Sequence, residues 1–407
     1  MVRVVTFGCR LNALESEHLQ RQAQKIGLQN CVIINSCAIT AEAERQVRQA
    51  VRKIARENPT TRLIVTGCAG TFDPTLYAAL PQVIAVIPNE KKHDLGTWQA
   101  LVDHSAPSQE ENATKNPGLR ARAYIAIQNG CDHFCSYCLV PKTRGRSRSL
   151  PYEEILKSLR VAFQQGYPEV VLTGVDIAAY RENDLTLGQL VQRLLHDVPE
   201  LPQLRLSSLD PAAIDASLVE AWAKEPRLMP HAHLSLQSGA PPVLREMNRR
   251  HTSESVQVLC AGLRAARPDI VFGADLIAGF PTEQAKDVDQ TLDLLSATGI
   301  TFLHVFPYSV RPETPAAALP TLPRSVVLER ARRLRQWGAA ALRQRFAPYI
   351  GQILPILGEK AHQGRTPHFF RVMGTSLSPR RIAPMRIIGC NETFLLADVL
   401  EKDASRE

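Results

Sequence analysis

Three cysteines are closely spaced in the loop that carries Cys131, Cys135 and Cys138. This loop follows an expected strand over residues 121–128. Thiolates bind iron in iron–sulfur clusters, and a cubane cluster usually takes four of them. After Cys138 the next cysteine is Cys260, far along the chain. The spacing therefore predicts a four-iron cluster that is held by three thiolates and leaves one iron open to another ligand.

A second set of three cysteines follows three expected strands. The pairs are Val2–Phe7 with Cys9, Val32–Asn35 with Cys37, and Leu63–Thr66 with Cys68. Helical segments over Glu15–Lys25 and Ala41–Glu57 lie between them, and this alternation predicts a parallel sheet. Ligands bind beyond the carboxyl ends of such strands, so the three cysteines should meet at one edge. They predict a second cluster with an open iron, and three buried core cysteines are the alternative.

Other residues of the chain that could belong to a cluster site are interpreted differently. Cys31, Cys260 and Cys390 are scattered and are interpreted as small buried hydrophobic residues. Asn12 either caps the helix that follows, with Glu15 completing a capping box, or lies beside the cluster. The sequence does not decide between these two interpretations of Asn12.

The composition indicates a soluble, intracellular chain. The chain has 407 residues, of which 44% are hydrophobic and 22% are charged, and its length suggests two or three domains. No apolar run approaches the roughly 18 residues that span a bilayer, and the N-terminus lacks the pattern of a signal peptide. We therefore expect a cytoplasmic protein without a membrane partner, in which the nine cysteines do not form structural disulfides.

The central region continues the alternation of strands and helices. The expected strands are Ala121–Gln128, Glu169–Thr173, Gln203–Ser207, His233–Leu236, Val271–Ala278 and Phe302–Phe306. Six such units are two short of an eightfold barrel, so we expect an open, partial α/β barrel. Several strand ends carry small and polar residues, and together they predict a pocket for a polar organic molecule. These ends are Thr173–Asp176, Ser207–Pro211, Gln237–Gly239 and Gly279–Pro281.

Positive charge increases toward the C-terminus of a chain whose net charge is +8. A helical run over Arg324–Arg345 precedes short strand-like pieces that are typical of a small antiparallel barrel. Five arginines and no acid occur over 361–391, with His368, Phe369 and Phe370 among them. Basic strands with aromatic residues bind single-stranded or looped RNA; the alternative is a solvated basic face. The same two alternatives hold for the alternating Lys142, Arg144, Arg146 and Arg148.

The cysteine loop, with Pro141, Arg144 and Gly145 after it, resembles the signature of the radical S-adenosylmethionine (SAM) methylthiotransferases. The N-terminal cysteines resemble the extra domain of that family. Further matching segments are Leu234–Gly239, Met247–Thr252, Asp275–Pro281 and His304–Ser309. Within the family, the last of these and Asn248–Arg250 resemble the subfamily that acts on N6-threonylcarbamoyladenosine beside the tRNA anticodon.

The resemblance implies three domains and a linker. We expect a doubly wound, parallel-sheet methylthiotransferase domain over 1–103, a linker over 104–118, a radical SAM domain over 119–346 and an RNA-binding barrel of the TRAM type over 347–407. It also implies two [4Fe-4S] clusters and SAM. The cysteines at 131, 135 and 138 would hold the cluster that cleaves SAM, and those at 9, 37 and 68 the cluster that supplies sulfur. Candidate SAM contacts are Tyr137, Gly174, Gln237, Ser238 and Arg249.

The resemblance also implies a reaction and its partners. A radical derived from SAM would abstract hydrogen from C2 of the adenine, and sulfur insertion and methyl transfer would follow. The anticodon stem-loop of tRNA is the expected substrate, with a flavodoxin or ferredoxin as electron donor, and the chain is compatible with a monomer. Alternatives are a methylthiotransferase for isopentenyladenosine in tRNA or for an aspartate of a ribosomal protein. A more distant alternative is a non-catalytic RNA-binding protein that depends on zinc, although structural zinc sites usually have four ligands.

Overall fold

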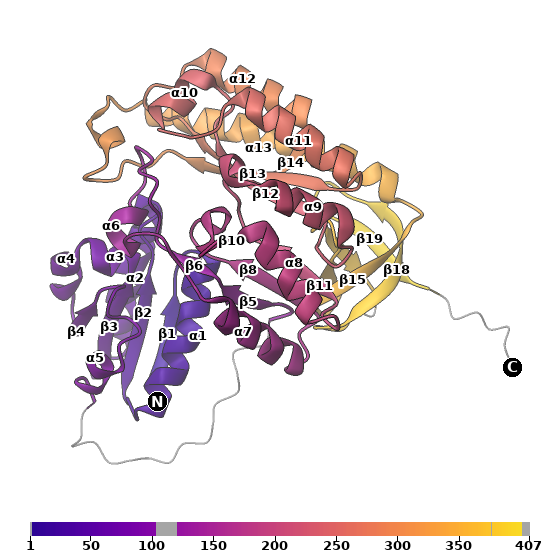
Figure 1. Ribbon diagram of the computed structural model, residues 1–407. Coiled ribbons are helices and arrows are strands. Elements are labelled where there is room, and N and C mark those ends of the chain that lie inside the picture. Colours follow the sequence, from indigo (N-terminus) through magenta and orange to yellow (C-terminus); the bar gives the residue numbers. More distant parts are fainter. Residues whose placement is uncertain (1, 103–119, 376, 401–407) are drawn as a thin grey trace, which may run out of the picture. The chain divides into compact units, whose positions relative to one another are not determined.

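The computed structural model describes residues 2–102, 120–375 and 377–400 (Figure 1). The expected linker over 104–118 lies outside the described residues. The described chain divides into two compact units. The first comprises residues 1–118, 129–148 and 309–318, and the second comprises 119–128, 149–308 and 319–407. Neither unit contains, among its described residues, a helix long and apolar enough to cross a membrane. The division into three domains stays a prediction.

The first unit is built on a four-stranded parallel sheet. Its strands lie in the order β1 (Val2–Thr6), β2 (Cys31–Ser36), β3 (Arg62–Gly67) and β4 (Val83–Ile87). Its helices are α1 (Arg10–Lys25), α2 (Ala41–Glu57), α3 (Cys68–Phe72), α4 (Pro74–Ala78), α5 (Leu95–Gln99) and α6 (Val140–Arg144). The expected parallel sheet is therefore confirmed, while α1 begins five residues before the predicted start at Glu15.

Side chains that alternate along the strands of this sheet fill two separate cores. Ile33 on β2 packs in one core with Leu19 of α1 and Trp98 of α5. The next residue, Ile34, packs in the other core with side chains of α2. Successive strand residues point to opposite faces, so a continuous apolar strand must be covered on both. Cys31 lies in the first core, as a buried hydrophobic residue.

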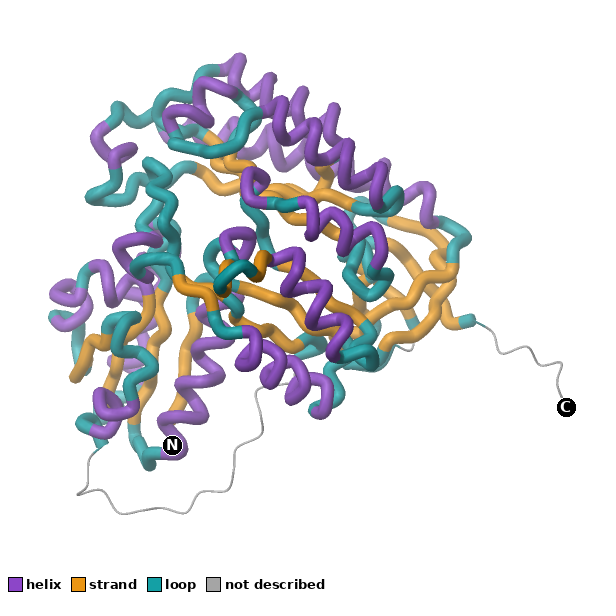
Figure 2. Tube along the Cα trace, in the orientation of Figure 1, coloured by secondary structure: helices purple, strands orange, loops and turns teal. Residues whose placement is uncertain are grey.

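The second unit contains the open α/β barrel that the sequence predicts. One group of parallel strands has the order β5 (Ala123–Ala126), β8 (Glu169–Thr173), β11 (Gln203–Leu206), and the other has the order β12 (His231–Gln237), β13 (Val271–Ala278), β14 (Ile300–Pro307). Strands are coloured orange in Figure 2. An isolated parallel bridge between Leu209 and Leu234 connects the two groups. The helices are α7 (Tyr152–Gln164), α8 (Leu187–Asp197), α9 (Ala216–Lys224), α10 (Pro241–Glu246), α11 (Ser253–Ala266) and α12 (Ala285–Thr298). Cys260 is part of their common apolar core.

A long helix, α13 (Arg324–Phe346), leads to a small closed barrel. Its strands are β15 (Ile353–Lys360), β16 (Gln363–Arg365), β17 (Arg371–Gly374), β18 (Ile382–Cys390) and β19 (Leu395–Val399). The barrel closes in the order β15-β16-β17-β19-β18. The predicted small barrel is confirmed with two differences. Strand β16 has no apolar pattern of its own, and β17 pairs with β19 in parallel, so the barrel is only mostly antiparallel.

The barrel is joined to the central sheet by a group of buried charges. Glu169 at the start of β8 accepts two hydrogen bonds from Arg205, at 3.0 and 2.9 Å, and a short one from Arg122. Arg122 also bonds Glu359 of the barrel, which in turn pairs with Arg365 at 3.1 Å. Burial alone would raise the pKa of Glu169, but the two arginines lower it, so the carboxylate stays ionised.

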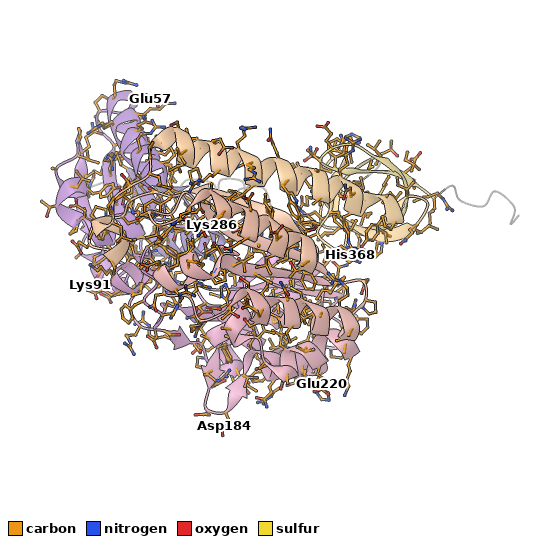
Figure 3. The ribbon with its side chains drawn as sticks, turned by 90° about the horizontal axis from the view of Figure 1, so that it is seen from above. Glu57, Lys91, Asp184, Glu220, Lys286 and His368 are labelled. Carbon is orange, nitrogen blue, oxygen red and sulfur yellow. The ribbon has the colours of Figure 1, made fainter. Side chains whose placement is uncertain are left out.

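Aromatic residues of the barrel take part in the same packing. The guanidinium groups of Arg122, Arg205 and Arg365 all lie within 5.5 Å of the centre of the Phe369 ring. Phe370 is fully buried, and His368, labelled in Figure 3, pairs with Asp269 at 3.2 Å. The sequence assigned these aromatic residues to an RNA-binding face, and this interpretation is wrong because they fill the junction between barrel and sheet.

The buried charges give a prediction for stability. Replacing Glu169→Gln leaves the Arg122 and Arg205 cations buried without their shared carboxylate, and breaking a buried ion pair in this way costs about 3–5 kcal/mol. Denaturant unfolding followed by circular dichroism should show this loss in the free energy of unfolding. Glu220→Gln is the control, because Glu220 lies at the surface of α9 (Figure 3) and should leave the stability nearly unchanged. Equal stability of the two variants would contradict the assignment.

Candidate functional site

The first unit brings the three N-terminal cysteines to the carboxyl edge of its sheet. Cys9 is the N-cap of α1 directly after β1, Cys37 follows β2, and Cys68 is the first residue of α3 after β3. Burial raises the pKa of the Cys37 thiol to about 12, and the neighbouring Cys68 and Cys9 add to this effect. The thiol of Cys37 therefore interacts with both of the others, and the three form one group.

The backbone approaches the cysteine sulfurs closely at this edge. Gly8 has a φ of +91°, and a Cβ there would lie 2.6 Å from the Cys37 sulfur. The backbone N–H of Ile39 donates to that sulfur over 3.5 Å, and the Asn89 side-chain amide donates to the sulfur of Cys68 over 3.6 Å. Hydrogen bonds to sulfur are among the means by which proteins hold and tune iron–sulfur clusters. A glycine beside one cysteine and donors on two sulfurs fit a cluster site.

The loop with Cys131, Cys135 and Cys138 also belongs to the first unit. Its base is closed by Gly130, where a Cβ would lie 2.0 Å from the carbonyl oxygen of Arg146. The backbone N–H of His133 donates to the Cys131 sulfur and that of Val140 to the Cys138 sulfur, each over 3.4 Å. Two sulfurs of this loop thus accept hydrogen bonds, which fits the second cluster.

Three charged side chains are buried next to the N-terminal cysteines. Glu15 of α1 accepts hydrogen bonds from Lys92 at 2.8 Å and from Arg144 at 2.9 and 3.1 Å. Lys92 is fully buried, and the other two are at most 6% exposed. Burial alone would lower the pKa of Arg144, but Cys68, Glu15 and Cys9 raise it. Arg144 is therefore a permanent cation that interacts with the cysteine group; the sequence singled it out only as part of the family signature and did not show that it is buried.

The role of Asn12 is settled by the same contacts. Its side-chain amide donates to the carbonyl oxygens of Phe7 and Ser36, at 2.9 and 2.8 Å. Its carbonyl oxygen accepts a hydrogen bond of 2.6 Å from Arg144. Helix α1 starts at Arg10 without a side-chain cap, so the capping interpretation is wrong. Asn12 instead fastens the ends of two strands to Arg144, beside the cysteines.

The buried charges of Glu15, Lys92 and Arg144 do not cancel one another. Lys92 and Arg144 share the single carboxylate of Glu15, so with Lys92 protonated one buried positive charge lacks a carboxylate partner among the described residues, and burial accordingly lowers the pKa of Lys92. Buried charges are retained where they are paired. A four-iron core with a charge of two plus and three thiolate ligands has a net single negative charge. A cluster on Cys9, Cys37 and Cys68 would therefore balance the excess cation.

The predicted SAM contacts of the second unit have different environments. Gly174 packs against the backbone of Gln128, where a Cβ would lie 2.6 Å from the carbonyl oxygen. Ser238 accepts from the backbone N–H of Ala240 and is buried. Gln237 ends β12 with a φ of +69°, a left-handed conformation that is uncommon outside glycine. Close packing thus accounts for the small residues Gly174 and Ser238. Gln237 instead has a strained backbone conformation, which residues in binding sites often have.

Arg249, the fourth of these candidates, belongs to a group of charges at the ends of the strands. It donates to the carbonyl oxygen of Ser235 at 2.7 Å and lies 3.3 Å from Asp210. Arg250 pairs with the same carboxylate at 2.7 Å and with Asp176 at 3.4 Å. Burial raises the pKa of Asp176, and Asp210 adds to this effect. The sequence placed both aspartates at strand ends but gave no sign that they share an arginine.

Tyr137 and the remaining basic residues of the cysteine loop lie in the first unit. Tyr137 is half-buried. Lys142 pairs with Glu313 at 2.8 Å, Arg146 pairs with Asp132 at 2.8 Å, and both are exposed. Arg148 is exposed as well. Of the four alternating basic residues, only Arg144 is buried.

Two family models match the chain. The model of the radical SAM superfamily matches residues 125–295, and the model described as uncharacterized protein family UPF0004 matches residues 1–87. The first match covers the cysteine loop and most of the open barrel. The second covers the parallel sheet that carries the N-terminal cysteines.

Curated proteins match over nearly the full length. The chain is 41% identical to threonylcarbamoyladenosine tRNA methylthiotransferase MtaB of Rickettsia prowazekii, over 96% of each chain. It is 32% identical to tRNA-2-methylthio-N(6)-dimethylallyladenosine synthase of Cereibacter sphaeroides, over 89% of this chain and 88% of the other. Among solved structures, the radical SAM methyltransferase TsrM of Kitasatospora setae matches with a TM-score of 0.52 and 16% identity, over 75% of this chain and 68% of the other. This last likeness shows the fold alone.

The buried carboxylate of Glu15 predicts how stability depends on pH. Burial alone would raise its pKa, but Lys92 and Arg144 outweigh burial and lower it to about 2. A depressed folded-state pKa stabilises the fold above the unfolded-state pKa of about 4.3, and this contribution is lost as the pH falls toward 2. The melting temperature of metal-free protein should therefore fall steeply below about pH 4.3. Glu15→Gln should flatten this dependence, and the exposed control Glu57→Gln should keep it. Parallel curves for Glu15→Gln and the parent protein would contradict the prediction.

Proposed function

This chain belongs to the methylthiotransferase family of radical SAM enzymes, and we propose that it converts N6-threonylcarbamoyladenosine next to the tRNA anticodon to its 2-methylthio derivative. The observation that carries this substrate is the similarity to MtaB proteins over nearly the full chain, at 41% identity in one case. The relative that acts on the dimethylallyl nucleoside is 32% identical. Modification of isopentenyladenosine is therefore the second candidate.

The six cysteines of the two groups would hold the two [4Fe-4S] clusters. Cys131, Cys135 and Cys138 lie in the matched radical SAM region, and Cys9, Cys37 and Cys68 lie in the matched N-terminal region. When bound, the clusters and SAM supply reductive cleavage of SAM and transfer of sulfur and a methyl group to C2 of the adenine, which acid–base side chains cannot perform. The protein supplies ligands, counter-charge and position.

The role of Arg144 and Lys92 in this function is electrostatic. Both cations are held by Glu15, and both interact with the sulfur of Cys68. They would stabilise negative charge on the N-terminal cysteine group, including that of anionic sulfur bound for transfer. Because Arg144 lies six residues after Cys138, the same segment carries a ligand of one cluster and a counter-charge of the other. The two cluster sites therefore both depend on this one short segment of the chain.

We assign SAM binding to the strand ends of the second unit and to Tyr137 of the loop. Gln237 and Arg249 are the stronger candidates, because one has a left-handed backbone and the other belongs to a buried group of charges. Gly174 and Ser238 would act by keeping the backbone close and fixed. Arg250 joins this proposal, since it is partly exposed and is held by two carboxylates.

RNA binding is assigned to the C-terminal barrel, as a domain of the TRAM type. Arg365 is half-buried and stacks on Phe369, whereas Arg371, Arg381 and Arg386 are exposed. Exposed cations on a small barrel favour contact with a phosphate backbone. A flavodoxin or ferredoxin as electron donor, a monomeric state and a cytoplasmic location complete the proposal, in keeping with a tRNA substrate.

Nucleoside analysis tests the proposed substrate. Mass spectrometry of tRNA nucleosides from a deletion strain should show loss of the 2-methylthio derivative of N6-threonylcarbamoyladenosine, with the unmodified precursor accumulating. The wild-type gene should restore it. Cys37→Ala should not restore it, while the protein retains one cluster and still cleaves SAM. Cys390→Ala is the matched control, because Cys390 packs against the barrel core and should restore the product. Loss of the methylthio form of isopentenyladenosine instead would establish the second candidate.

The proposed counter-charge predicts a change in redox potential. In a chain that lacks Cys131, Cys135 and Cys138 and keeps the N-terminal cluster, Arg144→Gln should lower the midpoint potential, because reduction adds negative charge where a cation has been removed. At an effective dielectric constant near 20, a unit charge several ångströms from the cluster changes its midpoint potential by an amount on the order of 100 mV. Redox titration followed by EPR measures the shift. Arg144→Lys should keep most of the potential, and Arg146→Gln should leave it unchanged. A potential that is the same in all variants would show that Arg144 only fastens the fold.

A further inference from the structure

Three side chains outside the cysteine groups meet on adjacent strands of the second unit. They are His233 on β12, Asp275 on β13 and His304 on β14. The Nε2 atom of His233 lies 3.1 Å from Oδ1 of Asp275, and Nδ1 of His304 lies 3.2 Å from the same oxygen. All three candidate ligand atoms lie within 4.8 Å of one another. The parallel register places Asp275 directly opposite His304.

These separations agree with those of ligands around a single ion. First-row divalent metals bind imidazole nitrogen and carboxylate oxygen at about 2.1 Å. Two neighbouring ligands at right angles around such an ion are then about 3.0 Å apart. The nitrogen-to-oxygen distances of 3.1 and 3.2 Å are close to this value. The two imidazole nitrogens lie within 4.8 Å of each other, so a shared ion would draw them together by rotation of the exposed His304 side chain.

The surroundings hold the three groups in place. A Cβ on Gly273 would lie 2.4 Å from Nδ1 of His233, so the imidazole rests against the bare backbone of β13. The rings of His233 and His304 lie with their centres 4.7 Å apart. Ser208 donates to the second oxygen of Asp275 over 3.2 Å. Such a hydrogen bond to a ligand carboxylate is typical of metal sites, where it fixes the orientation of the ligand.

Burial of the group is uneven and leaves one side open. The side chain of His233 is 10% exposed, that of Asp275 is 20% exposed and that of His304 is 58% exposed. Burial alone would raise the pKa of Asp275, but hydrogen bonds from His233 and His304 outweigh it, so the carboxylate is ionised. A metal ion bound at the buried side of the three side chains would have its remaining coordination positions on the exposed side, next to His304.

We propose that His233, Asp275 and His304 form a binding site for a divalent first-row transition metal ion. Two imidazoles and one carboxylate on one side of an ion leave its other positions to water or to an anionic oxygen ligand. The site is distinct from both cysteine groups, and it needs no thiolate. It does not depend on which nucleoside the enzyme modifies. The competing account is a purely hydrogen-bonded group in which both imidazoles donate to Asp275.

Metal titration of the full-length protein with both clusters in place tests the site. Mn²⁺ is the probe, because its free aqueous form is counted by EPR while the oxidised clusters are silent. The parent protein, freed of loosely bound metal, should bind one Mn²⁺ per chain, and Zn²⁺ should displace it. Asp275→Asn and His304→Gln should lose this binding. Ser208→Ala should bind about tenfold more weakly, as expected for a group that orients a ligand.

Controls separate loss of the ion from loss of the fold. His196→Gln removes an exposed imidazole of the same unit that also pairs with a carboxylate, and it should bind Mn²⁺ like the parent. His304 is exposed, so its replacement should leave the melting temperature and the cluster absorbance unchanged. Mn²⁺ binding that is absent from the parent, or equal in the parent, Asp275→Asn and His304→Gln, would overturn the proposal. Activity toward tRNA is not needed for either outcome.

Discussion

The paired contact of Glu15 with Lys92 and Arg144 is the constraint on which the first unit depends. One carboxylate and two cations are removed from water together, and the fold gains only if further partners compensate the second cation. Asn12, which accepts a hydrogen bond from Arg144, and Cys68 and Cys9, which raise the pKa of Arg144, are those partners. The ends of β1 and β2, helix α1 and the segment after the cysteine loop are therefore held by one set of contacts. A cluster on the N-terminal cysteines would complete its charge balance.

The second unit also buries charged side chains that need partners, in a different set of contacts. Glu169 is shared by Arg122 and Arg205, and Glu359 of the barrel is shared by Arg122 and Arg365. The guanidinium groups cover the faces of Phe369, so that charge and aromatic surface are buried together. A buried carboxylate shared by two cations thus joins barrel and sheet here, and another such carboxylate lies beside the N-terminal cysteine group in the first unit.

Much of the architecture could be predicted from local patterns. The six central strands and the N-terminal parallel sheet follow from alternating apolar segments, and the structure has both. Boundaries were less certain: α1 starts at Arg10, because Cys9 turns the chain directly into the helix. Strand β16 was missed because three residues, Gln363–Arg365, carry no periodicity. His368, Phe369 and Phe370 were assigned to the surface because a sequence of aromatic and basic residues looks the same whether it is exposed or packed.

By itself, the sequence determined the two cysteine groups, the order of the elements and, through its motifs, the family. These features depend on residue type and on spacing along the chain. The tertiary structure decided which charges are buried and with whom they pair. Arg144 is separated from Arg146 by one residue, and although Arg144 belongs to the family signature, nothing in the sequence shows that it alone reaches Glu15. His233, Asp275 and His304 meet because parallel strands align in register. Such pairings join distant segments, and their energy depends on burial, which only the assembled fold provides.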